Sequence, residues 1–186
     1  MKPPKSLYFL PFLLIALPGC KDDVLPKPKA MLRLEYPNAS FAQWEGNCPF
    51  SFSYNIAAIP DIKDDCSMTI HYGSMNAAIF ISYKQVDGNL EKLLSDAQKL
   101  SYEHAAKANN IVEQPFVNGA DKVFGMYYEV QGNAASQAQF YATDSVAHFL
   151  TGSLYFSARP NYDSILPAAD YLQGDVRKIM ESLRWK

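Results

Sequence analysis

Two short runs near the middle of the chain alternate apolar and polar positions. Residues 67–72 and 77–83 have this period-two pattern on either side of Gly73-Ser74-Met75-Asn76, which predicts two strands joined by a tight turn. The second run carries apolar residues on both faces, so we expect the rest of the protein to cover both. These faces are formed by Ile79, Ile81 and Tyr83 on one side and by Phe80 and Ser82 on the other.

Apolar residues at a spacing of three to four follow the second run. Asp87-Gly88-Asn89 separates this stripe from the strand and can cap a helix. The stripe extends from Leu90 to Ala108 and predicts a helix with one face toward the core. Its members are Leu90, Leu93, Leu94, Ala97, Leu100, His104 and Ala108.

Period-two alternation returns after Lys122 and predicts three further strands. The short polar connections Gly132-Asn133 and Asp144-Ser145 separate them, so we expect an antiparallel meander. The apolar positions are Phe124, Met126, Tyr128 and Val130 in the first strand, Phe140 and Ala142 in the second, and Leu150, Leu154 and Phe156 in the third.

A second helix is predicted at the end of the chain. It begins near Asp163-Ser164, where either residue can act as the N-cap, and its apolar stripe runs from Ile165 to Leu183. Strands, helix, strands and helix in this order predict an α+β fold, in which an antiparallel β-sheet packs with two main α-helices. The order of elements resembles that of the PsbP-like sandwich.

The N-terminus has the pattern of an export signal. A basic start precedes an apolar run at residues 7–17, which is too short to span a bilayer as a helix and fits a signal peptide. The run ends at Leu17-Pro18-Gly19-Cys20, which resembles the lipobox of bacterial lipoproteins. We therefore expect residues 1–19 to be removed and Cys20 to carry acyl chains such as palmitate, which anchor the protein in a membrane. An ordinary export signal with an incidental cysteine is the alternative.

The residues after Cys20 predict a spacer in front of a folded domain. Lys21-Asp22-Asp23 resembles a surface-export signal of lipoproteins in some gliding bacteria, and a solvated charged leader is the alternative. Leu25-Pro26-Lys27-Pro28-Lys29 favours an extended polyproline II segment. We therefore expect residues 20–30 to be a lipidated tether and residues 31–186 to be a single domain, large enough to fold alone.

Cys48 and Cys66 remain once Cys20 is assigned to lipid. An even pair of cysteines in an exported domain predicts a disulfide, and a loop of 18 residues would contribute about 3 kcal/mol to stability. Free thiols are one alternative. A metal site that adds His71 is the other, but it lacks a close Cys-x-x-Cys pair and a fourth ligand.

Composition and motifs argue against two classes of function. The net charge of −2 leaves no basic field for nucleic acid. The sequence contains no Gly-x-Ser-x-Gly motif and no phosphate-binding glycine loop, and His71, His104 and His148 are far apart along the chain. We therefore expect no enzyme activity, no cofactor and no metal. Four tyrosines in predicted strands are assigned to the core rather than to a sugar-binding platform: Tyr127, Tyr128, Tyr141 and Tyr155.

Two tripeptides resemble acceptors for O-glycosylation in the envelope of some gliding bacteria. They are Asp144-Ser145-Val146 and Asp163-Ser164-Ile165. Each serine also has a structural explanation, since Ser145 falls in a predicted turn and Ser164 at a predicted helix N-cap.

Several longer segments resemble one family, the gliding-motility lipoprotein GldD. They are Leu25-Pro26-Lys27-Pro28-Lys29, Leu32-Arg33-Leu34-Glu35-Tyr36-Pro37, Asn89-Leu90-Glu91-Lys92-Leu93-Leu94, Gly132-Asn133-Ala134-Ala135-Ser136, Thr143-Asp144-Ser145, His148-Phe149-Leu150-Thr151-Gly152, and Pro160-Asn161-Tyr162-Asp163-Ser164-Ile165-Leu166-Pro167-Ala168-Ala169. The resemblance covers nearly the whole chain, lipobox included. It implies a non-enzymatic envelope lipoprotein that is needed for gliding and is associated with type IX secretion, and it assigns no catalytic residue.

The leading hypothesis is an assembly or scaffold lipoprotein that contacts other gliding and type IX secretion proteins, in the outer membrane rather than the inner. A module that binds an envelope glycan or lipid is the alternative, and an enzyme acting on cell-wall material is the third. We expect the partner surface at Asn133, Asp144 and Tyr162, because these polar segments are not explained as core. Turn chemistry is the alternative explanation for all three.

Overall fold

The computed structural model describes residues 36–103, 107–157 and 161–186, all within the unit Met31–Lys186. Cys20, Lys21, Asp22, Asp23 and His104 lie outside the described residues. The helices and strands are β1 (Phe41–Glu45), β2 (Phe50–Asn55), β3 (Ile59–Ile62), β4 (Met68–Tyr72), β5 (Ala77–Gln85), α1 (Leu90–Glu103), β6 (Ala108–Asn118), β7 (Val123–Gly132), β8 (Ser136–Thr143), β9 (His148–Phe156), α2 (Tyr162–Glu181) and β10 (Arg184–Trp185).

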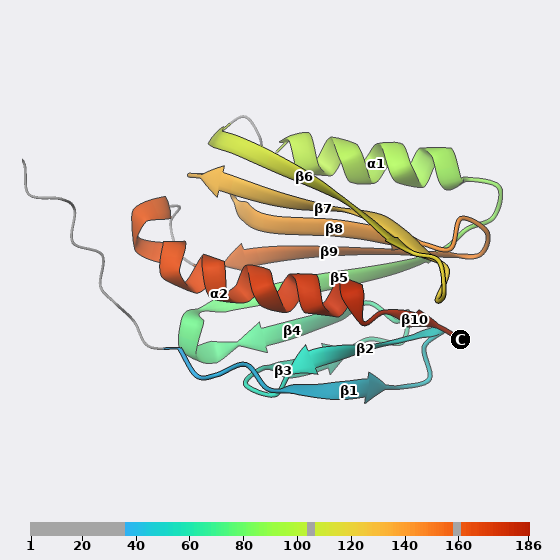
Figure 1. Cartoon of the computed structure of the whole chain (residues 1–186), viewed down its shortest axis with the longest axis horizontal. Helices are drawn as coiled ribbons and strands as arrows, with labels where there is room; N and C mark the ends of the chain where they lie inside the picture. Colours follow the sequence, from blue (N-terminus) through green and yellow to red (C-terminus); the bar gives the residue numbers. More distant parts are fainter. Residues whose placement is uncertain (1–35, 104–106, 158–160) are drawn as a thin grey trace, which may run out of the picture. The chain divides into compact units, whose positions relative to one another are not determined.

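Two antiparallel sheets contain these strands (Figure 1). The larger has seven strands in the order β3-β4-β5-β9-β8-β7-β6, and the smaller has three in the order β1-β2-β10. The consecutive strands β7, β8 and β9 are neighbours, as expected for a meander, whereas β5 pairs with β9 across the elements between them. The predicted α+β class, with antiparallel strands and two helices, is confirmed.

One face of the seven-stranded sheet is covered by α2 and by the three-stranded sheet. Figure 1 shows α2 running across β9 and β5, and the helix also contacts β2. Leu150 of β9, Leu172 of α2 and Phe50 of β2 are fully buried in one apolar cluster. The ring of Phe50 lies 5.6 Å from that of Tyr83 on β5. This face therefore holds the main core, because burying each large apolar side chain contributes roughly 1.5–3 kcal/mol.

The opposite face of the sheet packs against α1. Neighbouring residues of a strand point to opposite faces, so Phe149 faces away from the main core and joins Leu93 and Ala97 of α1 in a second, smaller cluster. Tyr141 of β8 packs against the same cluster. Phe80 of β5 is 48% exposed, so the expectation that both faces of this strand are covered is wrong. The reason is that α1 packs over Phe149 and Tyr141 and leaves part of β5 open.

Two predicted helix boundaries also need correction. Helix α1 is described to Glu103, and Ala108, the last member of the predicted stripe, is instead the first residue of β6. Pairing of β6 with β7 over most of its length outweighs the weak helical signal of a single alanine. Helix α2 begins at Tyr162, with Asn161 at the N-cap position. Ser164 therefore lies inside the first turn, where its Oγ donates to the Asn161 carbonyl (2.8 Å), and it is not the cap.

The sequence pattern does not predict β1, β2, β3, β6 or β10. In β2, Phe50 and Phe52 alternate with serines, and the pattern is obscured because Ser51 is buried as well. Strand β10 has two residues, which is too short to show any period. Of the four tyrosines assigned to the core, Tyr127 and Tyr128 are buried as predicted. Tyr141 and Tyr155 are only half-buried, and Tyr155 lies against the exposed ring of Phe80 on the open part of the sheet.

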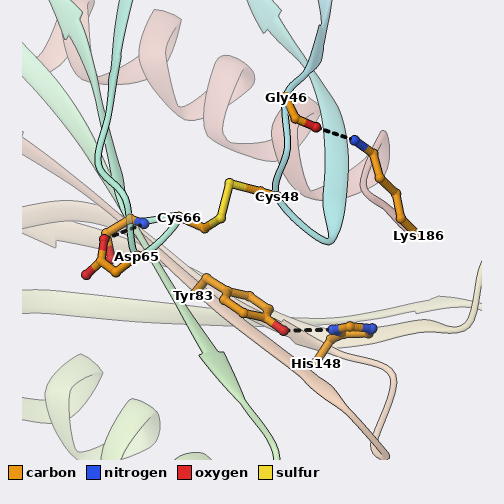
Figure 2. The surroundings of a disulfide bond; sticks show 8 residues. Gly46, Cys48, Asp65, Cys66, Tyr83, His148 and Lys186 are labelled. Atoms are coloured by element: carbon orange, nitrogen blue, oxygen red, sulfur yellow. Dashed lines mark hydrogen bonds between the residues drawn. A yellow bond between two sulfur atoms is a disulfide. The ribbon is translucent and has the colours of Figure 1, made fainter.

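The disulfide between Cys48 and Cys66 is present, with the two Cα atoms 5.6 Å apart. Cys48 follows β1 and Cys66 lies between β3 and β4 (Figure 2), so the bond ties the three-stranded sheet to the seven-stranded sheet. The predicted pairing is confirmed.

Candidate functional site

The loop between β8 and β9 is held by a single carboxylate oxygen. Asp144 Oδ1 accepts the backbone N–H groups of Val146 (2.9 Å), Ala147 (2.8 Å) and His148 (2.8 Å). Partial burial disfavours the charged carboxylate, but the three N–H donors outweigh it and hold the pKa of Asp144 below its usual value. The loop is therefore fixed rather than loose, and Asp144 is a structural centre of it.

Thr143 supports the same loop from the end of β8. Its Oγ1 accepts the N–H of Ser145 (2.9 Å) and donates to the carbonyl of His148 (2.6 Å). Ser145 has a φ of +67°, a left-handed conformation that turns favour. The tip consists of exposed Ser145 and of Val146, whose exposed fraction is 76%. The apolar side chain of Val146 is thus exposed to solvent at the tip of an ordered loop.

His148 begins β9 directly behind this loop. Its Nδ1 lies 2.9 Å from the hydroxyl of Tyr83 (Figure 2), and its ring stacks on Trp185 with centroids 5.1 Å apart. Burial, reinforced by the charge of Asp144, raises the pKa of Tyr83. These contacts give His148 a packing role between β5 and the C-terminal strand.

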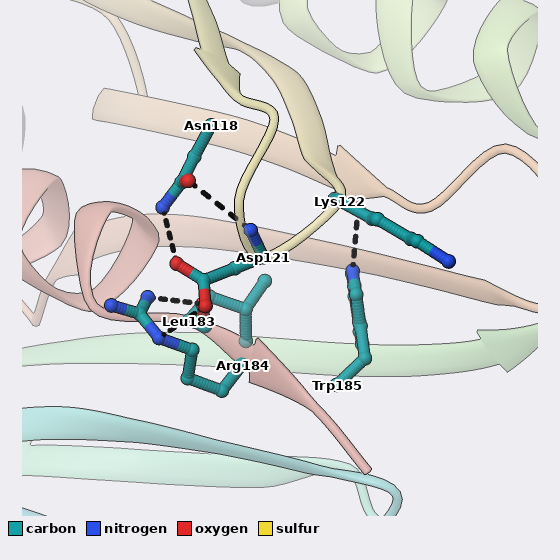
Figure 3. Close-up of polar contacts among 6 residues, drawn as sticks. All are labelled: Asn118, Asp121, Lys122, Leu183, Arg184 and Trp185. Carbon is teal, nitrogen blue, oxygen red and sulfur yellow. Dashed lines mark hydrogen bonds and ion pairs between the residues drawn. The ribbon is translucent and has the colours of Figure 1, made fainter.

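The C-terminal strand closes this end of the sheet onto the turn between β6 and β7. Arg184 Nε lies 2.8 Å from Asp121 Oδ1, and Asn118 Nδ2 donates to the other oxygen of the same carboxylate (2.7 Å). Trp185 Nε1 donates to the carbonyl of Lys122 (3.2 Å) (Figure 3). The apolar pattern of the sequence does not predict this group, although Asn118-Gly119 is a turn signal that indicates its position.

A shallow hollow of about 340 Å³ lies between the β8–β9 loop, the β6–β7 turn and β10. Its charged walls are largely satisfied, because Asp121 pairs with Arg184 and Asp144 binds backbone N–H groups. Among the residues that the structure describes, no group of three or more His, Cys, Asp or Glu side chains could hold a metal ion. Asp121 and Asp144 therefore act as structural acceptors in the walls of this hollow.

Asn133 and Tyr162 lie together, but away from the β8–β9 loop. Asn133 Oδ1 accepts the backbone N–H of Tyr162 at 2.8 Å and so caps the start of α2 from the β7–β8 connection. Tyr162 belongs to the helix and is half-buried, and burial raises the pKa of its hydroxyl, with the charge of Asp170 adding to the effect. Strand β8 separates this pair from Asp144 by roughly 20 Å or more. The three residues proposed as one surface therefore form two separate groups.

Ser145 and Ser164 are both exposed in the structure. O-glycosylation of either stays a prediction.

Comparison with protein families gives a match over most of the chain. The model of the gliding motility lipoprotein GldD family covers residues 21–185. The chain belongs to this family. The match includes every described residue except Lys186, so the β8–β9 loop and the C-terminal strand both belong to the GldD region.

Membership in the GldD family makes the chain a gliding motility lipoprotein of the cell envelope. None of the helices in the described part of the chain is long and apolar enough to cross a membrane. Comparison with curated proteins gives no match.

Proposed function

We propose that this GldD-family lipoprotein is a non-catalytic assembly component of the gliding apparatus, linked to type IX secretion, and that it contacts its partners through the β8–β9 loop. The observation that carries the proposal is Val146, which is 76% exposed at the tip of a loop fixed by Asp144. Loops held by a rigid sheet are common places for recognition, since the scaffold fixes their geometry.

The energetics of such a contact favour binding. Complete burial of a valine side chain contributes roughly 1.5–3 kcal/mol. A loop that is already ordered loses little conformational entropy when a partner binds. Asn133 needs no partner to explain it, because it caps α2, and the proposal therefore rests on the loop alone.

We further propose that acylated Cys20 anchors the chain in the outer membrane rather than the inner. Residues 20–30 would then hold the domain away from the lipid surface, and Lys21-Asp22-Asp23 would direct export. The support for this arrangement is the lipobox-like sequence and the lipoprotein family match.

Site-specific photocrosslinking in living cells tests the contact. A photoreactive residue at position 146 is compared with one at position 59. Ile59 is 73% exposed on edge strand β3 and pairs with His71 at the other end of the sheet. We expect a discrete adduct with a gliding or type IX secretion protein from position 146 and none from position 59. The same adduct pattern from both positions, or no adduct from position 146, would contradict the proposal.

A further inference from the structure

A groove runs along the open part of the seven-stranded sheet, beside α1. Two cavities of about 340 and about 250 Å³ lie side by side, since Ser82, Leu100 and Thr151 line both of them. Leu93, Ala97 and Leu100 of α1 form one wall, and β4, β5 and β9 form the floor. We call this feature the α1 groove. Volumes of 300 Å³ and above are typical of sites for small ligands.

The floor of the α1 groove combines hydroxyl groups with an exposed aromatic ring. Phe80 lies between Thr69 of β4 and Ser153 of β9 in the strand register, and Ser82 pairs with Thr151. Hydroxyl side chains thus flank the phenyl ring on both sides and continue along the groove. Each hydroxyl can donate one hydrogen bond and accept two.

The aromatic part of the groove floor consists of two rings that contact each other. The rings of Phe80 and Tyr155 lie 5.6 Å apart at 76°, in an edge-to-face arrangement. Phe80 is 48% exposed and Leu100, on the facing wall, is 39% exposed. A flat apolar surface is therefore open to a ligand, although Phe80 is held in place by its neighbour.

The geometry points to the α1 groove as a binding site for neutral oligosaccharides, with Phe80 as the stacking platform and Ser82 and Thr151 among the hydrogen-bonding groups. A sugar ring has an apolar C–H face and a rim of hydroxyls, which matches an aromatic ring among serine and threonine side chains. This inference goes beyond the proposed protein contacts, which use the β8–β9 loop.

Charge and polarity distinguish this ligand from others. Lys84 and Asp96 line one end of the groove, where Asp96 is ion-paired with Lys92 (2.9 Å), and Lys63 lines the other end. The floor between these ends, which contains Phe80, Ser82 and Thr151, carries no charged side chain and therefore favours an uncharged ligand. An acyl chain would bury the floor hydroxyls without replacing their hydrogen bonds to water, which costs about 1–3 kcal/mol for each group. A neutral polar ligand satisfies them.

The test uses the full-length lipoprotein in lipid nanodiscs, applied to an array of neutral hexose and N-acetylhexosamine oligosaccharides. We expect binding with a Kd of about 1 mM or tighter for at least one of them. Phe80→Ala should weaken that binding about tenfold or more. Phe41→Ala is the matched control, since Phe41 is 39% exposed on β1, outside the groove, and it should bind like the parent.

Two further variants separate stacking from simple apolar contact. Phe80→Trp should keep or strengthen binding, whereas Phe80→Leu should lose it as Phe80→Ala does, with thermal unfolding unchanged in each. The inference is overturned if no array glycan binds the parent, if Phe80→Leu binds normally, or if Phe41→Ala weakens binding equally. None of these results bears on crosslinking from position 146, so the two proposals can fail separately.

Discussion

Asp144 receives three backbone N–H groups on one carboxylate oxygen, and the exposed position of Val146 depends on these bonds. Asp144→Ala removes the acceptor and leaves three donors unpaired, so we expect a loss of about 1–2 kcal/mol in the free energy of unfolding. Asp144→Asn keeps an acceptor oxygen and should lose less. Urea denaturation at pH 7 measures both, and equal losses would show that the acceptor is not what matters.

The pH dependence of the parent gives an independent check on Asp144. Its pKa is lower in the folded state than in the unfolded chain. Its contribution is therefore present above the unfolded-state pKa and is lost as the pH falls through the folded-state value. The stability difference between the parent and Asp144→Ala should shrink in acid, and a difference that stays constant down to pH about 2 would contradict this.

The pKa of Asp175 on α2 is raised, whereas that of Asp144 is lowered. The Asp175 side chain is buried, accepts a hydrogen bond from Asn55 Nδ2 (2.9 Å) and has a raised pKa because of burial. A raised folded-state pKa means that stability falls as the pH rises through it. Asp175→Asn keeps an acceptor without the buried charge, so at pH 8 it should be more stable than the parent by on the order of 1 kcal/mol. The gain should vanish in acid.

Exposed Asp61→Asn on β3 is the control for this comparison. It should change stability little at any pH. Thermal unfolding of the parent and both variants from pH 4 to 8 measures these differences. If Asp175→Asn is less stable than the parent at pH 8, the charged carboxylate of Asp175 stabilises the fold and the prediction is wrong.

At the scale of elements, the sequence predicts the parts whose apolar periods are long and undisturbed. The meander β7–β9, the hairpin β4–β5 and α2 all have such periods. The pattern does not predict strands in which a polar residue is buried, such as Ser51 in β2. It also does not predict β10, which is only two residues long. The register that brings Trp185 onto His148 comes from tertiary packing, so neither residue could be placed at the site from local pattern.

The disulfide adds a covalent link between the two sheets, which are also joined by packing and by the polar contacts of β10. Replacing both cysteines, Cys48→Ala with Cys66→Ala, should lower the free energy of unfolding by about 3 kcal/mol, because the unfolded chain gains the entropy of an open loop. Urea denaturation measures the total.

Hydrogen exchange shows which strands lose protection when the disulfide is removed. The amides of β1 and β2 should lose more protection than those of β7 and β8, since Cys48 lies beside the three-stranded sheet. Uniform loss across both sheets would contradict the view that the bond holds that sheet in place.

The two faces of the larger sheet in the described domain are covered unequally. Helix α2 and the three-stranded sheet bury one face of the larger sheet, while α1 covers part of the other and leaves the α1 groove. The β8–β9 loop lies at one end of the strands, where β10 closes the core. This arrangement keeps the proposed contact loop, the α1 groove and the capped start of α2 on different parts of the surface.

The proposed membrane anchor of the chain is the acylated side chain of Cys20. Cys20→Ala removes the acylated side chain, and several acyl chains bind a membrane almost permanently. We expect the variant to move to the soluble envelope fraction, as measured by fractionation and by mass spectrometry of the N-terminus. A wild-type N-terminus without lipid, together with unchanged fractionation of the variant, would refute the anchor.

The gliding speed of cells that carry Val146→Lys is the most direct test of the proposed contact through the β8–β9 loop. The charge would place an unpaired ammonium in an apolar contact without disturbing Asp144, whose bonds use the backbone of the loop. Ile59→Lys, equally exposed at the other end of the sheet, is the control. At matched envelope levels and melting temperatures, we expect Val146→Lys cells to stop gliding and Ile59→Lys cells to glide normally. Normal gliding of Val146→Lys cells would contradict it.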